Sequence, residues 1–175
     1  MALNLYEQLH DTPPPEAEGA ARIFGASPGA PVLAVSACLL GIPCRYDGLD
    51  KGLAALDRLT AGRRVLPLCA EVLAGLGVPR PPMVFEGGDG AAALAGTARL
   101  VDEHGRDCTA HLARGAALAV RLALAAGCVS ALLKARSPSC GVRQVHTGTG
   151  LVEGCGMFTA ACHQAGIPVR SDEGR

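Results

Sequence analysis

The chain has 175 residues, of which 49% are hydrophobic, and its sixteen basic and sixteen acidic residues leave no net charge at pH 7. This length supplies one compact domain with a single core. The balanced charge gives no general attraction to nucleic acid or an anionic membrane, and a 3% aromatic content leaves few side chains on which bases could stack. We therefore expect a protein without a nucleic-acid or membrane partner.

Eight cysteines are a high count for a chain of this length. The N-terminal stretch MALNLYEQLHDTPPPE has no basic segment followed by an apolar one, so it does not resemble a secretory signal. We therefore expect a cytoplasmic protein, in which clustered cysteines bind metal or take part in thiol chemistry more often than they form disulfides.

The first half of the chain predicts an extension followed by strands and helices. Residues 1–30 are rich in proline and glycine without a sustained period, which predicts a flexible extension before one domain over residues 31–175. Residues 31–37 and 64–69 are short continuous apolar runs, typical of strands buried on both faces. Between them, residues 51–62 have leucines at helical spacing.

The second half continues this alternation after a less regular stretch. Residues 70–90 are rich in glycine and proline, which predicts mostly loop. Residues 91–107 predict a short hairpin or an edge strand. The remaining expected elements are a helix over 108–127, a buried strand over 129–135, a loop over 136–154, a helix over 157–166 and a strand over 167–171. Alternating strands and helices predict an α/β single domain with a small, mainly parallel sheet flanked by helices, similar to Rossmann or flavodoxin folds.

Three cysteines occupy equivalent places in this pattern. Cys38 and Cys69 end the first and second apolar runs, and Cys140 lies just past the third. Because parallel strands end at one edge of a sheet, we expect the three sulfur atoms to converge there. Three thiolates suit a soft metal centre, either zinc or an iron-sulfur cluster. The alternative is that cysteine is simply a small core residue, which we expect for Cys108, Cys128 and Cys162.

Polar side chains accompany these cysteines. Glu71 follows Cys69 by two positions, Ser137 and Ser139 precede Cys140, and Asp47 lies in the loop after Cys38. A carboxylate beside a metal site can act as a general acid or base. The alternatives are structural: a solvent-facing Glu71 in the first turn of a helix, and ordinary turn chemistry for the two serines and for Asp47.

Three blocks of sequence, VSACLLGIPCRYDG, LPLCAEVLAGLGVPRPP and LLKARSPSCG, resemble the thiouracil desulfidase family of small bacterial proteins. The resemblance implies a [4Fe-4S] cluster bound by Cys38, Cys69 and Cys140, with one iron free for a substrate sulfur. It also implies Glu71 and Ser137 as the catalytic acid/base pair.

The reaction that this resemblance implies replaces C=S by C=O in a thiolated nucleobase or nucleoside such as 2-thiouracil. Hydrogen sulfide is released without net redox change. We further predict that Ser139 and Asp47, beside the motif residues, bind the substrate. The roles of Cys44 and Cys155 stay open.

Two other functions are compatible with the same residues. The first is a structural zinc or iron-sulfur module without turnover, in which the three cysteines stabilise the fold. The second is a thiol enzyme that uses Cys140 as its nucleophile, activated by its loop and the flanking serines.

Overall fold

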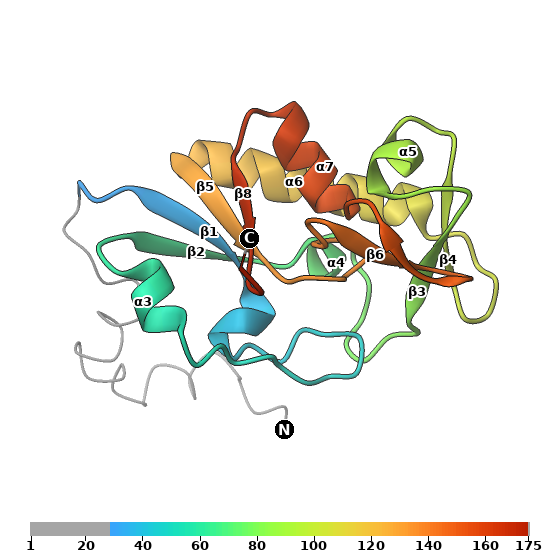
Figure 1. The fold of residues 1–175 in the computed structure, drawn as a ribbon, viewed down its shortest axis with the longest axis horizontal. Coiled ribbons are helices and arrows are strands. Elements are labelled where there is room, and N and C mark those ends of the chain that lie inside the picture. The colour runs from blue at the N-terminus through green and yellow to red at the C-terminus, as the bar shows by residue number, and fades with distance from the viewer. Residues whose placement is uncertain (1–28, 175) are drawn as a thin grey trace, which may run out of the picture.

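Four parallel strands form the central sheet, in the order β2-β1-β5-β8 (Figure 1). The computed structural model describes residues 29–174, so the predicted extension over residues 1–30 lies, except for its last two residues, outside the described residues. The strands are β1 (Val32–Ser36), β2 (Arg64–Leu68), β5 (Cys128–Leu133) and β8 (Val169–Ser171). Each coincides with one of the predicted apolar runs, which confirms the α/β fold with a mainly parallel sheet.

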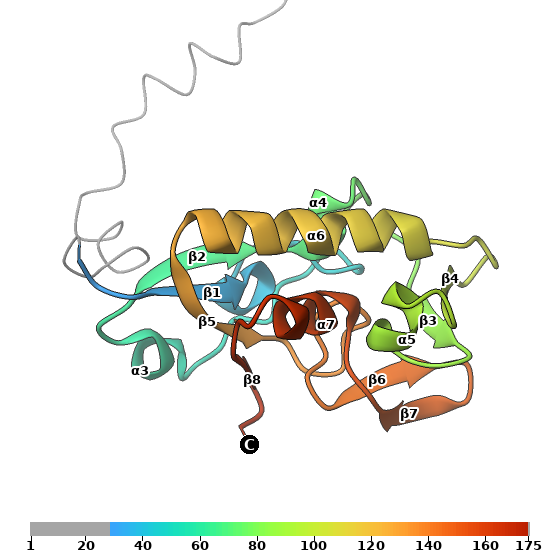
Figure 2. The same ribbon diagram turned by 90° about the horizontal axis from the view of Figure 1, so that it is seen from above.

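Helices cover both faces of this sheet. The long helix α6 (Thr109–Ala125) and α7 (Met157–Gln164) pack side by side over one face, whereas the short η1 (Ala37–Leu40) and α3 (Leu56–Thr60) lie on the other (Figures 1 and 2). No helix among residues 29–174 is long and apolar enough to cross a membrane.

The central strand β1 shows why this arrangement is stable. All five of its residues are buried, and successive side chains point to opposite faces. Ala34 packs in the core cluster formed with α6 and α7, whereas Leu33 and Val35 pack in the cluster with Leu39 of η1. The connection from β1 to β2 passes over one face of the sheet and that from β2 to β5 over the other. This change of face leaves a crevice at the carboxyl ends of these strands, which is where open α/β sheets bind their ligands.

A second sheet extends the domain beyond these carboxyl ends, in the order β4-β3-β6-β7. Its strands are β3 (Met83–Glu86), β4 (Arg99–Asp102), β6 (Gln144–Thr147) and β7 (Gly150–Glu153). Strand β4 confirms the edge strand predicted within residues 91–107. The stretch 70–90 is mostly loop, as predicted, but also contains α4 (Ala70–Leu73) and β3. The loop predicted over 136–154 is wrong, since it contains the β6-β7 hairpin. Strands of four residues are too short to show a clear period in the sequence.

The helix α4 is seated directly on α6 at a glycine. A Cβ atom added to Gly115 of α6 would lie 2.1 Å from the carbonyl oxygen of Ala70, a distance that no side chain can tolerate. The small residue thus lets the two helix backbones approach closely. This contact fixes the start of α4, which is where Cys69 and Glu71 lie.

Candidate active site

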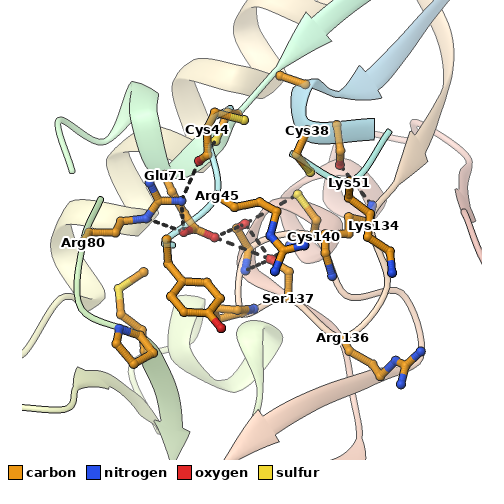
Figure 3. Close-up of a pocket in the computed structure, with 18 of the residues that line it drawn as sticks. Cys38, Cys44, Arg45, Lys51, Glu71, Arg80, Lys134, Arg136, Ser137 and Cys140 are labelled. Carbon is orange, nitrogen blue, oxygen red and sulfur yellow. Dashed lines mark hydrogen bonds and ion pairs between the residues drawn. The ribbon is translucent and has the colours of Figure 1, made fainter. Parts of the chain in front are cut away.

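The carboxyl ends of β1, β2 and β5 open into a pocket of about 530 Å³ (Figure 3). Met83 and Val84 of β3 and His146 of β6 line its other side, so the second sheet forms one wall. Six of the seven residues singled out in the sequence line this pocket: Cys38, Cys69, Glu71, Ser137, Ser139 and Cys140. The structure therefore brings these six residues together, although Glu71 and Ser137 are 66 positions apart in the chain.

Each of the three cysteines is held by the start of a helix or by a tight loop. Cys38 is the second residue of η1 and is buried, and Cys69 is the N-terminal cap residue of α4. Cys140 is buried at the end of the loop after β5, where its carbonyl oxygen accepts a 3.0 Å hydrogen bond from the hydroxyl of Thr159.

The N-terminus of α7 anchors the loop that carries Cys140. The backbone N–H of Met157 donates to the carbonyl of Pro138 at 3.0 Å, and the N–H of Phe158 donates to that of Ser139 at 2.8 Å. The first N–H groups of a helix have no partner within the helix. Here the loop supplies their acceptors, so the helix and the loop fix each other.

Gly156, just before α7, makes this close packing possible and provides a test of it. A Cβ atom at this position would lie 2.4 Å from the carbonyl carbon and oxygen of Ser139. We expect Gly156→Ala to displace the loop and to destabilise the fold by about 1–3 kcal/mol, as overpacking does elsewhere. Thermal unfolding measures this change. Gly148→Ala is the matched control, because nothing lies within 4 Å of its added carbon; equal melting temperatures for the two variants would contradict the packing argument.

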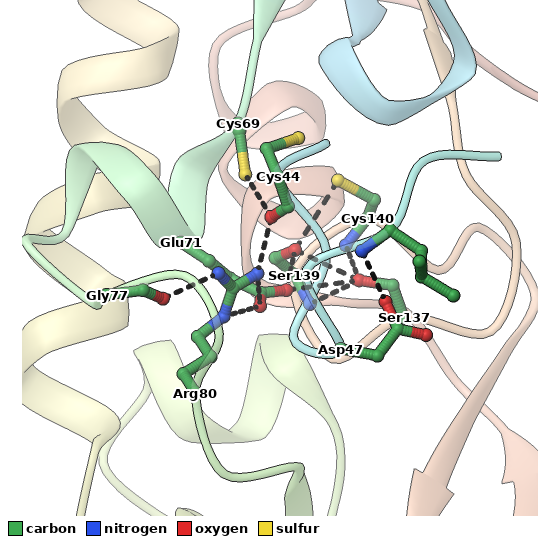
Figure 4. A network of polar contacts seen from close by, with 10 residues as sticks. Cys44, Asp47, Cys69, Glu71, Gly77, Arg80, Ser137, Ser139 and Cys140 are labelled. Atoms are coloured by element: carbon green, nitrogen blue, oxygen red, sulfur yellow. Dashed lines mark hydrogen bonds and ion pairs between the residues drawn. The ribbon is translucent and has the colours of Figure 1, made fainter. Parts of the chain in front are cut away.

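Glu71 is buried, with only 7% of its surface exposed, and its carboxylate forms an ion pair with Arg80. Nε of Arg80 donates to Oε2 at 2.7 Å, and the remaining guanidinium nitrogens donate to the carbonyl oxygens of Gly77 and Cys44 at 3.0 and 2.9 Å (Figure 4). The alternative of a solvent-facing Glu71 is therefore wrong. Arg80 fixes the carboxylate and ties it to the loop that carries Cys44.

The hydroxyls of two serines, Ser137 and Ser139, face the other carboxylate oxygen of Glu71, Oε1. The hydroxyl of Ser139 donates to Oε1 at 2.7 Å, and the hydroxyl of Ser137 lies 3.5 Å from the same oxygen and 3.0 Å from Oγ of Ser139 (Figure 4). Oγ of Ser137 also accepts hydrogen bonds from the backbone N–H groups of Ser139 and Cys140, both at 3.1 Å. The carboxylate and the two hydroxyls thus form one connected network.

Cys44 is a fourth thiol in the pocket and is buried, as are Cys38 and Cys140, whereas Cys69 is half-buried. A hydrogen bond with the thiol of Cys38 raises the pKa of Cys44 to about 11, and a hydrogen bond with Cys44 together with burial raises the pKa of Cys69. Burial raises the pKa of Cys140 to about 12. A protonated, buried thiol is a poor nucleophile, so these surroundings disfavour Cys140 as a free catalytic nucleophile and leave metal binding as the way to a thiolate.

The cysteines of the pocket are the donor set to be compared with a metal centre. Within residues 29–174, no three His, Cys, Asp or Glu side chains converge closely enough to hold one metal ion. The thiolates of an iron-sulfur cluster bind different irons and stand further apart than the four ligands of a tetrahedral zinc. All eight cysteines are free thiols, and four of them line one pocket: Cys44 and the three that follow strands, Cys38, Cys69 and Cys140. Thiolates are the ligands of iron-sulfur clusters, so the chemistry of this donor set suits a cluster.

Basic side chains dominate the pocket, although the whole chain is neutral. Five basic residues and two acidic ones line it: Arg45, Lys51, Arg80, Lys134 and Arg136, with Glu71 and Glu173. Figure 3 shows Lys51 and Lys134 on the side of Cys38 and Arg80 on the side of Glu71. The pocket therefore favours anions, including thiolates and hydrosulfide.

Asp47 and Cys155 do not line the pocket. The carboxylate of Asp47 binds Nη2 of Arg45 at 2.7 Å and the backbone N–H of Leu49 at 3.1 Å, so it closes a turn and holds a residue that does line the pocket. The backbone N–H of Cys155 donates to Asp89, the residue before α5 (Gly90–Leu94). Neither contact involves the three cysteines.

Sequence reasoning missed several residues of this pocket. Arg80 lies in the proline-rich loop after α4, where no periodic pattern marks it. Lys134 directly follows β5, so the rule that pointed to the cysteines also applied to it. Arg45 and Tyr46 follow Cys44 in the block CRYDG, which resembled the family without indicating their roles.

A doubly wound α/β domain with cysteines at three strand ends, beside a buried carboxylate and two serines, defines a small enzyme with a cysteine-lined pocket. The family model described as 2-thiouracil desulfurase matches residues 33–174, and the chain belongs to this family. This membership confirms the family that the sequence predicted and gives removal of sulfur from thiouracil as its class of reaction.

Two individual proteins show the extent of the similarity. The uncharacterized protein YbbK of Bacillus subtilis (strain 168) is 35% identical over 144 residues, which cover 81% of this chain and 95% of YbbK. A solved structure named as the [4Fe-4S]-dependent thiouracil desulfidase TudS is 42% identical, with a TM-score of 0.71, and the match covers 82% of this chain and 91% of TudS.

Proposed function

We propose that this protein is a [4Fe-4S]-dependent desulfidase that converts the C=S group of a thiolated pyrimidine such as 2-thiouracil to C=O. Water supplies the oxygen and hydrogen sulfide leaves, so the reaction involves no net oxidation or reduction. The observation that carries this proposal is the single pocket in which Cys38, Cys69 and Cys140 lie beside the buried carboxylate of Glu71. Membership of the family and the similarity to TudS support it.

The three cysteines at the strand ends would hold the cluster. When bound, the cluster would supply a soft Lewis acid for the thiocarbonyl sulfur of the substrate. Lys51 and Lys134 provide positive charge on the same side of the pocket (Figure 3). This positive charge offsets the negative charge of the thiolates and stabilises the hydrosulfide anion as it leaves the ring.

Glu71 and Ser137 are the groups proposed to move protons. Arg80 holds one oxygen of the carboxylate, so Glu71 stays oriented toward the serines and serves as the final proton acceptor. Ser137 is half-buried and lines the pocket, so its hydroxyl can contact the attacking water. The proton returns along the same groups to the leaving sulfur.

Tyr46 is proposed to bind the pyrimidine ring. The other aromatic residues among residues 29–174, Phe85 and Phe158, are fully buried, whereas Tyr46 is 45% exposed and lines the pocket. Its carbonyl oxygen accepts a 2.8 Å hydrogen bond from the N–H of Arg80, and the guanidinium carbon of Arg45 lies 5.9 Å from its ring centroid. Asp47 would thus contribute to substrate binding indirectly, by holding Arg45.

Loss of the aromatic ring of Tyr46 is expected to weaken substrate binding. Stacking on an aromatic side chain stabilises a bound base by about 1–3 kcal/mol, so Tyr46→Leu should raise the KM for 2-thiouracil by about tenfold or more and leave kcat nearly unchanged. Tyr46→Phe keeps the ring and is the control. Sulfide release at varied substrate concentration measures both constants, and a KM that is equal in the Leu and Phe variants would refute stacking.

We also propose a small-molecule thiolated base or nucleoside, rather than tRNA, as the substrate. A protein that binds a polynucleotide neutralises many phosphates, whereas this chain has no net charge. The eight free thiols support a location in the reducing cytoplasm.

Anaerobic reconstitution with iron and sulfide tests the proposal. The loaded protein should be brown, contain about four irons per chain, and release sulfide from at least one of 2-thiouracil, 4-thiouracil and their nucleosides. A colourless protein that takes up no iron would reject the cofactor. A loaded protein that releases no sulfide from these substrates would reject the activity.

A further inference from the structure

Ser139 contributes a buried hydroxyl that the proposed pair of Glu71 and Ser137 leaves unused. Only 2% of its surface is exposed, and its Oγ lies 2.7 Å from Oε1 of Glu71. Ser137 is 3.5 Å from the same oxygen, which is too long for a strong hydrogen bond. The hydroxyl that contacts the carboxylate therefore belongs to Ser139, and Ser137 contacts Ser139.

The hydrogen bonds fix the direction of both hydroxyl protons. Oγ of Ser137 accepts from two backbone N–H groups, so its own proton is free for donation, and Oγ of Ser139 is its nearest acceptor at 3.0 Å. Ser139 has one proton, and a carboxylate at 2.7 Å is a stronger acceptor than the sulfur of Cys140 at 3.4 Å. Both protons consequently point from Ser137 through Ser139 to Glu71.

Glu71 offers little surface to the pocket, and both of its carboxylate oxygens already accept hydrogen bonds. Its Oε2 is held by the guanidinium of Arg80 and its Oε1 by Ser139, and the residue is buried. Glu71, Ser137 and Ser139 all line the pocket, but Ser137 is half-buried, whereas Glu71 and Ser139 are only 7% and 2% exposed. The hydroxyl of Ser137 is therefore the most accessible of the three groups to a water molecule in the pocket, and Ser139 lies between it and Oε1 of Glu71.

We propose that Ser139 is a positioning residue that relays a proton between Ser137 and Glu71, an inference that rests on the proposed function. As water attacks the carbon, a C–O bond forms and the C=S π pair moves onto sulfur. The O–H bond of the water breaks and its proton binds Ser137, whose oxygen releases one of its two backbone N–H hydrogen bonds to accept it. The proton of Ser137 then passes to Ser139, and that of Ser139 passes to Glu71. The net change is one proton moved from water to the carboxylate, with no change in oxidation state. The reverse sequence delivers this proton to the sulfur as the C–S bond breaks, and the second proton of the water leaves the C–OH group as C=O forms and protonates the hydrosulfide.

The test compares Ser139→Ala and Ser139→Thr with the wild-type protein, each loaded with iron. Removal of the hydroxyl should lower kcat for sulfide release from 2-thiouracil by about 10²-fold or more, the usual size of a general acid–base contribution, with little change in KM. Because threonine restores the hydroxyl, Ser139→Thr should recover most of this loss. Iron content and thermal unfolding, measured on the same samples, show whether each variant is folded and loaded.

Rates in mixtures of H2O and D2O separate a relay from a merely structural role. The wild-type rate should depend on the deuterium fraction along a curve, because several protons move together, whereas the residual rate of Ser139→Ala should follow a straight line. An unchanged kcat, an unchanged curve, or a rate loss explained by lost iron would overturn the relay and leave the desulfidase activity intact. A loaded wild-type protein that releases no sulfide would overturn the proposed function and the relay with it.

Discussion

Replacing Cys38, Cys69 or Cys140 by alanine is expected to abolish both iron retention and sulfide release. Each cysteine follows a different strand, and the backbone at each position is fixed by a helix start or by the loop that α7 anchors. Loss of one thiolate leaves the cluster with two of its three proposed ligands, so the cluster should no longer be retained. Iron and sulfide content after anaerobic reconstitution, together with the visible absorbance, measure the effect.

Two control variants make this prediction specific. Cys108 is half-buried at the start of α6 and does not line the pocket, so Cys108→Ala should bind iron like the wild-type protein. Cys44 is buried in the same pocket, so Cys44→Ala tests the assignment of the ligands. If Cys44→Ala lost its iron while one of the three proposed ligand variants kept it, the assignment of ligands would be wrong.

The parallel sheet could be predicted because buried strands leave a clear local signal. Residues 31–37, 64–69 and 129–135 are continuous apolar runs, and the structure forms β1, β2 and β5 there. The second sheet had no such signal. Strand β7 is exposed throughout, and β3 and β6 share a single residue pair, Phe85 with Thr147, so their pairing depends on the tertiary fold.

The residues of the site could be predicted only where their place at the end of a strand determines their position. The sheet topology places Cys38, Cys69 and Cys140 at one edge, and Glu71 is carried there with Cys69. The roles within the polar network depend on contacts between distant segments, such as that of Glu71 with Ser139, 68 positions away. The sequence therefore could not show which serine contacts the carboxylate, or that Arg80 pairs with it.

Glu71→Gln is expected to reduce sulfide release by about 10²- to 10⁴-fold, the range for loss of a general acid or base. The amide oxygen can still accept the hydrogen bond of Ser139, so the shape of the pocket is kept. The uncharged amide cannot take up the proton that the reaction produces. Iron content should equal that of the wild-type protein, because no proposed ligand changes, and a variant with near wild-type turnover would exclude Glu71 as the base.

The ion pair with Arg80 complicates this experiment, and the structure shows how to separate the effects. The side chains of Glu71 and Arg80 are only 9% and 6% exposed, so the single variant leaves a buried guanidinium without its counter-charge. Breaking such a pair destabilises a fold by about 3–5 kcal/mol, whereas removing both charges is often close to neutral. We expect Glu71→Gln combined with Arg80→Met to be more stable than Glu71→Gln alone and equally inactive. A double variant that recovered sulfide release along with stability would show that Glu71 acts through the fold and takes no part in the chemistry.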